Sequence, residues 1–569
     1  MTSGCAIYVG DQQLNPRTNP FGKDVANRGL YRALAEHGPW DDQLFLVHNR
    51  IDARELGLSL FDGAVPPKPI RATTILKQDE IAARGALLRG QANIDELAWI
   101  RRTFDERAYS LVGLIHSLAP PAMRAYISDV LISPVQPWDA LICTSPAVER
   151  HLRDLLVERA DYLSSRFAAP EGRRAPPLPH LPVIPLGIDT GRFARRGDPS
   201  RREPARRTLG IDDDVFTLLW VGRLSFFEKA YPQGMFAAAE ETARRTGRRV
   251  CFVMAGWFPS GERGREVWEE TAAVYAPSVD IRFLDGNDPR VLETVWPASD
   301  VFVSMVDNIQ ETFGITPIEA MASGLPVVVS DWDGYRFTVE EGVTGFRVPT
   351  MMAPSGMGQL MAQRHALGMD SYQTYGAQVA SHVAVNVRAA ADALTALAGD
   401  GERARSIGAA ARRYARSRFD WTAVIPQYAA LFEELAAIRS AAGAYERGRV
   451  PADNPVRKDP FAAFVDFATD VLSDDTLLRL PDGGAVDPRP HHAARMNAST
   501  EVWRLPVAQS LEILALVAER GPMAVGDLAA RVAGQPRDRL MLHLVWMCKV
   551  GLLDWETTEV IPLDRPGST

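Results

Sequence analysis

Short apolar runs recur along the first 330 residues, and segments with the spacing of amphipathic helices separate them. The runs cover residues 6–9, 44–47, 111–115 and 140–144 in a first series, and 215–222, 250–256, 279–284, 300–305 and 325–330 in a second. Apolar and polar residues do not alternate within them, which is typical of parallel strands that helices bury on both faces. The two series therefore predict an α/β fold with two doubly wound, Rossmann-like domains.

The pattern changes near residue 419. Residues 419–442 have the apolar spacing of one long helix, with Pro426 inside it, and a polar, proline-containing stretch follows at 446–460. Three helical segments follow at 510–521, 525–532 and 536–556, of which the last stops at Gly551 and leads into a strand. This order is that of a winged helix, so the C-terminal end predicts a small, mostly helical domain.

These features divide the chain into five segments. We expect one Rossmann-like domain over 1–182, another over 183–418, a long helix over 419–445, a linker with a short helix over 446–500, and a winged-helix-like module over 501–569. The proline-rich stretch 170–182 predicts the hinge between the first two domains.

Composition and charge exclude several classes of protein. Of the 569 residues, 46% are hydrophobic and 24% are charged, as in globular proteins and unlike disordered chains or coiled-coil rods. The formal net charge of −8 argues against broad nucleic-acid binding, which needs a basic surface. No apolar run is long enough to predict a membrane-spanning helix, and the N-terminus does not have the pattern of a signal peptide. We therefore expect a cytoplasmic protein, or one that lies peripherally on the inner membrane face.

The most informative stretch is 310–336, in which Glu311 and Glu319 are separated by seven residues. Thr316 is a good N-cap and Pro317 a good first helical residue, so Glu319 completes a predicted capping box. In one interpretation Glu319 only caps its helix. In the other, the helix N-terminus binds phosphate through the backbone amides of Phe313, Gly314, Ile315 and Thr316.

A second stretch, 218–241, places two cations after a predicted strand. The strand ends at Gly222, Arg223 follows it, and Lys229 comes six residues later. Ligands of doubly wound sheets bind at the carboxyl ends of the strands, where an arginine fork and a lysine suit a diphosphate. The alternative interpretation is a solvated basic loop.

Several sequence segments together closely resemble the retaining glycosyltransferases of family 4, which have the GT-B fold. They are VIPLGID at 183–189, VGRLS at 221–225 with the later Lys229, the two glutamates with FG between them, PIEAMASGLPVVVS at 317–330, LVGLIHSL at 111–118, DALICTSPAVERHL at 139–152 and the FDW that opens the long helix. The resemblance covers about residues 1–440. It implies two Rossmann-like domains that face a cleft, with the acceptor on the side of the first and the long helix packed back on that domain.

The resemblance also implies roles for individual residues. Arg223 and Lys229 would bind the donor diphosphate, Glu311 the donor sugar and Glu319 the ribose hydroxyls, while His116 would lie at the reacting sugar. The implied catalytic residues are His116, Glu311, Arg223 and Lys229. The implied donor-binding residues are Gly22, Gly222, Arg223, Lys229, Glu311, Phe313, Gly314, Ile315, Thr316 and Glu319. From its position alone, His116 is equally a core histidine at a strand end.

The sequence departs from the family pattern at three places. The N-terminal glycine-rich turn offers only Gly22, beside Lys23, where related enzymes often have a glycine pair. Ala230 follows Lys229 where a glycine is usual. Asp307 and Asn308 precede Glu311, where they would either lie near the sugar or acceptor or shape a turn.

The resemblance implies a hexosyltransferase-type enzyme of class EC 2.4. It would move a sugar from a nucleoside diphosphate sugar to an acceptor hydroxyl with retention of configuration. We expect no metal and no cofactor besides this donor. The alternatives are a catalytically inactive GT-B scaffold or another GT-B enzyme, a phosphorylase or epimerase, with a protein-interaction module at the C-terminus. The nucleotide base, the sugar and the acceptor, whether glycan, lipid-linked, small molecule or protein, stay open.

The C-terminal module predicts a protein partner rather than DNA. Residues 501–569 contain seven Lys or Arg and nine Asp or Glu, a net charge of −2. Winged helices that read DNA are basic. We therefore expect this module to bind a protein or a second copy of the chain.

Overall fold

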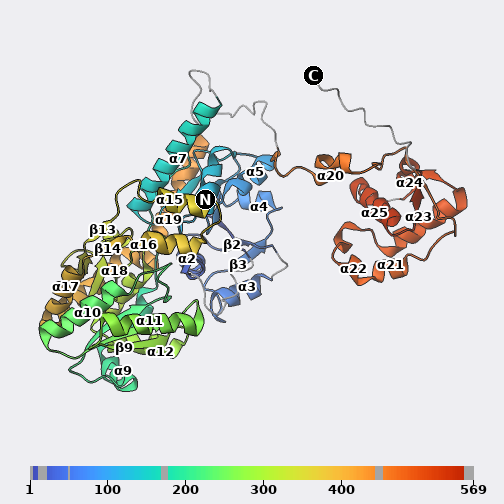
Figure 1. The fold of residues 1–569 in the computed structure, drawn as a ribbon. Helices are drawn as coiled ribbons and strands as arrows, with labels where there is room; N and C mark the ends of the chain where they lie inside the picture. Colours follow the sequence, from blue (N-terminus) through green and yellow to red (C-terminus); the bar gives the residue numbers. More distant parts are fainter. Residues whose placement is uncertain are drawn as a thin grey trace. The chain divides into compact units, whose positions relative to one another are not determined.

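The computed structural model describes residues 4–10, 22–48, 52–167, 177–442, 453–532 and 534–556. The chain forms two compact units, Met1–Ala452 and Asp453–Thr569 (Figure 1). The predicted hinge at 170–182 lies largely outside the described residues. None of the helices in these ranges has the length and apolar character needed to cross a membrane.

The first domain of unit 1 is a six-stranded parallel sheet in the order β3-β2-β1-β4-β5-β6. Its strands are β1 (Ala6–Tyr8), β2 (Gln43–Leu46), β3 (Ile70–Thr73), β4 (Ala86–Arg89), β5 (Ser110–Leu114) and β6 (Ala140–Ile142). Its helices are α2 (Gly22–His37), α3 (Ala53–Leu60), α4 (Gln78–Ala82), α5 (Asp95–Phe104), α6 (Pro121–Ser128) and α7 (Pro146–Arg166). This strand order is that of a Rossmann-like domain.

The second domain of unit 1 repeats this topology in the order β12-β11-β10-β7-β8-β9, again with parallel strands. The strands are β7 (Phe216–Val221), β8 (Val250–Gly256), β9 (Asp280–Asp285), β10 (Val301–Ser304), β11 (Val327–Ser330) and β12 (Gly345–Val348). The helices are α8 (Thr190–Arg196), α9 (Arg202–Leu209), α10 (Gln233–Thr246), α11 (Gly261–Tyr275), α12 (Pro289–Ala298), α13 (Ile315–Ser323) and α14 (Tyr335–Thr338). The prediction of two doubly wound domains is confirmed.

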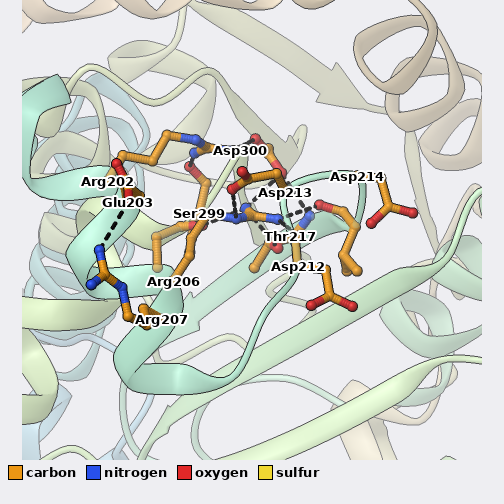
Figure 2. A network of polar contacts seen from close by, with 12 residues as sticks. Arg202, Glu203, Arg206, Arg207, Asp212, Asp213, Asp214, Thr217, Ser299 and Asp300 are labelled. Atoms are coloured by element: carbon orange, nitrogen blue, oxygen red, sulfur yellow. Dashed lines mark hydrogen bonds and ion pairs between the residues drawn. The ribbon is translucent and has the colours of Figure 1, made fainter.

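A buried arginine fixes the beginning of the strand that leads to the candidate site (Figure 2). Arg206 of α9 is 1% exposed and donates to the carbonyls of Val215 and Ala298 at 2.7 and 2.9 Å. Asp300 lies 3.6 Å from this guanidinium and accepts a hydrogen bond from the amide of Thr217 at 2.8 Å. Because a buried charge is tolerated only when it is paired and hydrogen-bonded, this network holds α9, β7 and the loop before β10 together.

The long C-terminal helix of unit 1 returns to the first domain. The elements after β12 are β13 (Thr350–Met352), α15 (Gln359–Ala366), α16 (Tyr372–Ala380), β14 (Val383–Val385), α17 (Val387–Gly399), α18 (Gly401–Phe419) and α19 (Trp421–Ala441). Asp420 caps α19, which packs against α2. Near its other end, Arg439 donates to the carbonyl of Gly85 at 2.8 Å. The segment from β13 to β14 is an addition that the sequence pattern did not predict.

Unit 2 has its own hydrophobic core, made by three helices and a small antiparallel sheet. Its elements are α20 (Pro460–Ala463), β15 (Leu477–Arg479), α21 (Arg489–Ala493), α22 (Arg495–Ala498), α23 (Val507–Arg520), β16 (Met523–Ala524), α24 (Val525–Arg531), α25 (Arg537–Lys549) and β17 (Asp554–Trp555). The stretch expected to be a linker, 446–500, supplies β15, which lies between β16 and β17 in this sheet. Winged-helix identity stays a prediction.

Candidate active site

Two glycines bring the ends of β7 and β8 together. Gly222, with φ of +150°, donates its amide to the carbonyl of Ala255 at 3.0 Å. A Cβ at Gly256 would lie only 1.9 Å from the carbonyl oxygen of Gly222. The chain therefore turns at Gly222 in a conformation that side chains rarely adopt, and Arg223 leaves the carboxyl edge of the sheet, as predicted.

Arg223 is not a solvated surface cation, because its side chain is only 11% exposed. Its guanidinium forms an ion pair with Glu228 and lies over the ring of Trp257, 5.8 Å from the centroid. The sequence analysis identified neither partner. Trp257 follows β8 at the same sheet edge, and this position was the signal available for finding it. A flat, fixed guanidinium of this kind suits recognition of a phosphate.

Lys229 and Glu311 form a direct pair, with Nζ 3.0 Å from Oε2. Burial alone would raise the pKa of Glu311, but the Lys229 charge and the backbone amides of Thr312 and Phe313 hold it below its ordinary value. Glu311 is thus an anion at neutral pH. The structure brings these two predicted residues together although 82 positions separate them.

The helix after Glu311 begins differently from the prediction. Gly314, in the left-handed conformation with φ of +89°, is the N-cap of α13, and no side chain caps this helix. The predicted capping box with Thr316 as N-cap is therefore wrong. A Cβ at Gly314 would lie 1.9 Å from the ring of Tyr335, whose hydroxyl contacts Ser304 at 2.9 Å and the side chain of Thr316. Only glycine fits this turn.

One of the backbone amides predicted to bind phosphate, that of Phe313, instead donates to the side chain of Glu311. The amide of Phe313 donates to Oε1 of Glu311 at 3.4 Å, while its ring packs against that of Phe419. Ile315 and Glu319 line a cavity. Burial raises the pKa of Glu319 to about 7, although the charges of Arg196 and Arg192 oppose this. Glu319 therefore exists as both acid and anion near neutral pH.

His116 follows β5 and belongs to a hydrogen-bonded chain. Its Nε2 lies 2.8 Å from Oδ1 of Asn27, and the amide of this asparagine donates to the carbonyl of Gly90 at 2.8 Å. Burial and the nearby charge of Lys23 lower the pKa of His116 to about 4, so the imidazole is neutral. The hydroxyl of Thr312 donates to the carbonyl of His116 at 2.8 Å, which ties this residue to the loop of Glu311.

Further hydrogen bonds join the two domains beside this loop. The hydroxyl of Thr144 donates to the carbonyl of Thr312 at 3.3 Å, and that of Ser145 donates to Asp333 at 3.2 Å. Asp333 has φ of +36°, and burial together with the charge of Glu311 raises its pKa to about 7. Sequence reasoning missed Asp333, although it lies only three residues after the end of β11.

Asp307 and Asn308 shape the loop. The side-chain amide of Asn308 donates through Nδ2 to the carbonyl of Phe227 at 2.6 Å, and its Oδ1 accepts from the backbone amide of Gln310 at 2.9 Å. Asp307 accepts from the backbone of Tyr231 at 3.3 Å, and burial raises its pKa to about 8. Both residues thus join the Glu311 loop to the Lys229 loop, in agreement with the turn-shaping alternative.

A cavity of about 1570 Å³ lies between the two domains of unit 1. The first domain lines it from α2 and the carboxyl edge of its sheet, and the second from α8, α13 and α18. Lys23 belongs to the lining, whereas Gly22 is an exposed first residue of α2 with open space around its Cα. Across the residues described, no three His, Cys, Asp or Glu side chains gather as metal ligands would.

Comparison with known proteins agrees with this arrangement. Residues 201–355 match the family model of glycosyl transferases group 1. This range contains Arg223, Lys229, Glu311 and Glu319, so the second domain of unit 1 is similar to this family over the residues of the candidate site.

Curated relatives are named D-inositol 3-phosphate glycosyltransferase. The protein of Actinosynnema mirum is 31% identical over 191 residues, which are 33% of this chain and 43% of the relative. That of Corynebacterium glutamicum is 28% identical over 269 residues, 47% of this chain and 55% of the relative. The chain thus spans about half the length of the relatives it matches.

Two solved structures are similar at low identity. HepE of Anabaena, in complex with UDP, has a TM-score of 0.49 and 14% identity, over 76% of this chain and 100% of that one. Sucrose-phosphate synthase of Thermosynechococcus elongatus has a TM-score of 0.48 and 19% identity, with the same coverage.

Proposed function

We propose, from its similarity to glycosyl transferases group 1, that this chain transfers a sugar from a nucleoside diphosphate sugar to an acceptor hydroxyl, with retention of configuration. Transfer of a hexose would place it in class EC 2.4. The names of the curated relatives support glycosyl transfer, and we do not carry over their acceptor. The proposed reaction uses neither a metal nor a cofactor beside the donor.

The observation that carries this proposal is the pair of Lys229 and Glu311 at the N-terminus of α13. The cation and the helix terminus together offer positive potential to a diphosphate, and Glu311 offers a carboxylate to sugar hydroxyls. Arg223, held over Trp257, adds a second cation at the same sheet edge. Glu319, in the first turns of α13, is the proposed partner of the ribose.

In the proposed reaction the acceptor oxygen bonds to the anomeric carbon while the bond from that carbon to the diphosphate oxygen breaks. The hydroxyl proton passes to the departing phosphate oxygen on the same face of the sugar. Lys229 and Arg223 stabilise the charge that develops on the leaving group. His116, neutral and oriented by Asn27, contacts the reacting sugar as a hydrogen-bonding partner.

A panel of UDP, GDP and ADP sugars tests the proposal, with thermal shift and release of the free diphosphate as readouts. We expect one donor to stabilise the full chain, by about 2.7 kcal/mol at 100 times its dissociation constant. Arg223→Gln should weaken binding of the matching diphosphate by about 1.5–3 kcal/mol. Arg265→Gln, an exposed change on α11, is the control.

Two results would contradict the proposal. One is the absence of stabilisation by every donor in the panel. The other is turnover that EDTA abolishes and Mg²⁺ or Mn²⁺ restores, because the proposed diphosphate site consists of cations and a helix terminus.

A further inference from the structure

The carboxyl edge of the first sheet carries polar side chains that the proposed donor site does not use. Tyr8 ends β1 and Arg89 ends β4, and the two are paired in register on neighbouring strands. His48 follows β2, and Lys23 is the second residue of α2. All four line the cavity between the domains, and we call them the edge cluster.

Neutral groups hold the arginine of this cluster in place. The Arg89 guanidinium lies over the ring of Tyr8, 5.0 Å from the centroid, and donates to the carbonyl of Asn93 at 2.8 Å. The hydroxyl of Tyr8 lies 2.7 Å from Nε2 of His48, and the two rings meet edge to face. Within the described part of the chain, no carboxylate pairs with Arg89 or Lys23.

The surrounding cavity concentrates positive charge although the chain as a whole has a net charge of −8. Nine lysines and arginines line it, against six aspartates and glutamates. On the first-domain side, Asp62 is already paired with Arg28 at 2.9 Å and with Arg32 at 3.0 Å. A cavity with unpaired, preoriented cations favours an anionic ligand.

The position of the edge cluster indicates that this anionic ligand is the acceptor rather than the donor. The residues proposed for the donor, Arg223, Lys229, Glu311 and Glu319, all belong to the second domain. The edge cluster belongs to the first domain, and of these four donor residues Glu319 lines the same cavity, from the second domain. Lys23 lies near enough to His116 for its charge to act on that imidazole, so an anion held by Lys23 lies near the residue that is proposed to contact the reacting sugar.

We propose that Arg89 and Lys23 bind an anionic group of the acceptor, a phosphate or a carboxylate. This inference rests on the proposed glycosyl transfer and deepens it by naming the acceptor class. The planar fork of Arg89, fixed by Tyr8, matches two oxygens of such a group, and Lys23 adds a mobile point charge. Tyr8, held by His48, acts as the positioning residue for Arg89.

Binding of small anions to the full chain tests the inference. The chain is first saturated with UDP, GDP or ADP, whichever stabilises it most, so that the diphosphate residues are occupied. Inorganic phosphate, acetate and neutral glycerol are then titrated by calorimetry or ligand-observed NMR. We expect one of the anions to bind and glycerol not to bind. Arg89→Gln and the exposed Lys23→Gln should each weaken anion binding at least tenfold. The anion that binds more tightly, phosphate or acetate, shows whether the acceptor group is a phosphate or a carboxylate.

A control separates this site from the rest of the cavity. Arg416→Gln removes an exposed cation of α18 that lines the same cavity from the second domain, and it should leave anion affinity unchanged. Equal anion affinity in the wild type and in both edge-cluster variants would overturn the inference. A loss of anion affinity in Arg416→Gln as large as that in the edge-cluster variants would also overturn it. Binding of the nucleotide without binding of any anion overturns this inference alone. Failure of every nucleotide to bind contradicts the proposed function instead.

Discussion

At the scale of single residues, the sequence identified most of the charged groups that the structure brings together. Arg223 could be found because it comes just after a predicted strand, and Lys229, Glu311 and Glu319 because they stand in motifs of the family that the sequence resembles. Trp257 and Asp333 could not, since their partners lie on other loops of the sheet edge. Glu228 lies in the same loop as its partner Arg223, five residues away, where no regular spacing marks the contact. Contacts between distant loops depend on the tertiary fold, which local spacing does not encode.

The pair of Lys229 and Glu311 makes a prediction about stability and pH. In the wild type the pKa of Glu311 is lowered, so the pair stabilises the fold above the ordinary pKa of a glutamate and loses this contribution as the pH falls. In Lys229→Met only the backbone amides of Thr312 and Phe313 still oppose the effect of burial, so that pKa rises relative to the wild type. We expect the variant to lose about 1–3 kcal/mol of unfolding free energy at pH 7 and less at pH 4.

Chemical denaturation at several pH values measures this effect. The double variant Lys229→Met with Glu311→Gln is the matched control, because it removes the carboxylate as well. A loss for Lys229→Met that is constant between pH 4 and 7 would show that the pair is not coupled.

At the scale of elements, purely apolar strands could be predicted even when they are short, and short strands that contain an arginine could not. The strands β3, β4 and β12 each have four residues, and each contains an arginine, so their apolar signal is too weak to stand out. The left-handed turn before α13 was missed for another reason. Thr316 and Pro317 are good helix starters, but the contact of Gly314 with Tyr335 places the helix start earlier.

Gly314→Ala tests this turn. The new Cβ adds backbone strain at φ of +89° and a clash with Tyr335, so we expect a loss of about 2–4 kcal/mol of unfolding free energy. Gly210→Ala is the control, since Gly210 also has positive φ, +61°, but open space around it. Thermal denaturation should show a larger loss for Gly314→Ala, and equal losses would remove the Tyr335 contact from the explanation.

A hydrogen-bonded chain of side chains crosses the helices of unit 2. Nδ1 of His543 accepts from the amide of Leu505 at 3.3 Å, and its Nε2 lies 2.9 Å from Oγ of Ser510. Ser510 in turn contacts Nε2 of His492 at 2.9 Å. Because Nδ1 of His543 accepts, Nε2 carries its proton and donates to Ser510. Protonation of Nδ1 breaks this arrangement.

Unit 2 should therefore lose stability in acid. Burial and the charges of His492 and Arg504 lower the pKa of His543 to about 4, below the value of about 6.5 in the unfolded chain. The unfolded state thus gains a proton first, and stability falls as the pH drops from 6.5 to 4, by about 3 kcal/mol. Calorimetry of the wild type and of His543→Gln should show a clearly smaller slope in the variant, in which His492 still has a lowered pKa. His382→Asn, a control at an exposed histidine of unit 1, should show the same slope of unit 2 stability with pH as the wild type.

At the scale of the whole molecule, the apolar pattern predicted both doubly wound domains and the long helix, and the family resemblance implied that this helix packs back on the first domain. The apolar pattern did not predict that β15 joins the C-terminal unit, because a three-residue strand is stable only with its partners β16 and β17. Nor did it predict the cavity, whose lining comes from segments as far apart in the chain as Tyr8 and Thr422.

Truncation within 443–452 tests the independence of the units. Unit 1 keeps its own core and all of α19, so we expect it to stay folded and to bind the donor diphosphate with unchanged affinity. Calorimetry with the diphosphate and light scattering on both forms measure affinity and mass. A folded unit 1 that no longer binds the diphosphate would mean that the C-terminal unit belongs to the active site.

The carboxylates beside Arg223 and Lys229 also bear on the effect of salt. A phosphate that binds there replaces Glu228 and Glu311, so the number of charge contacts scarcely changes, and screening affects both sides of the exchange alike. Arg89 is held by the neutral groups of Tyr8 and Asn93, and an anion that binds it makes a new charge contact, which ionic strength weakens. Rising salt should therefore leave the affinity for the donor nearly constant while it lowers the affinity for the acceptor. At high ionic strength the enzyme should then bind the donor but not the acceptor.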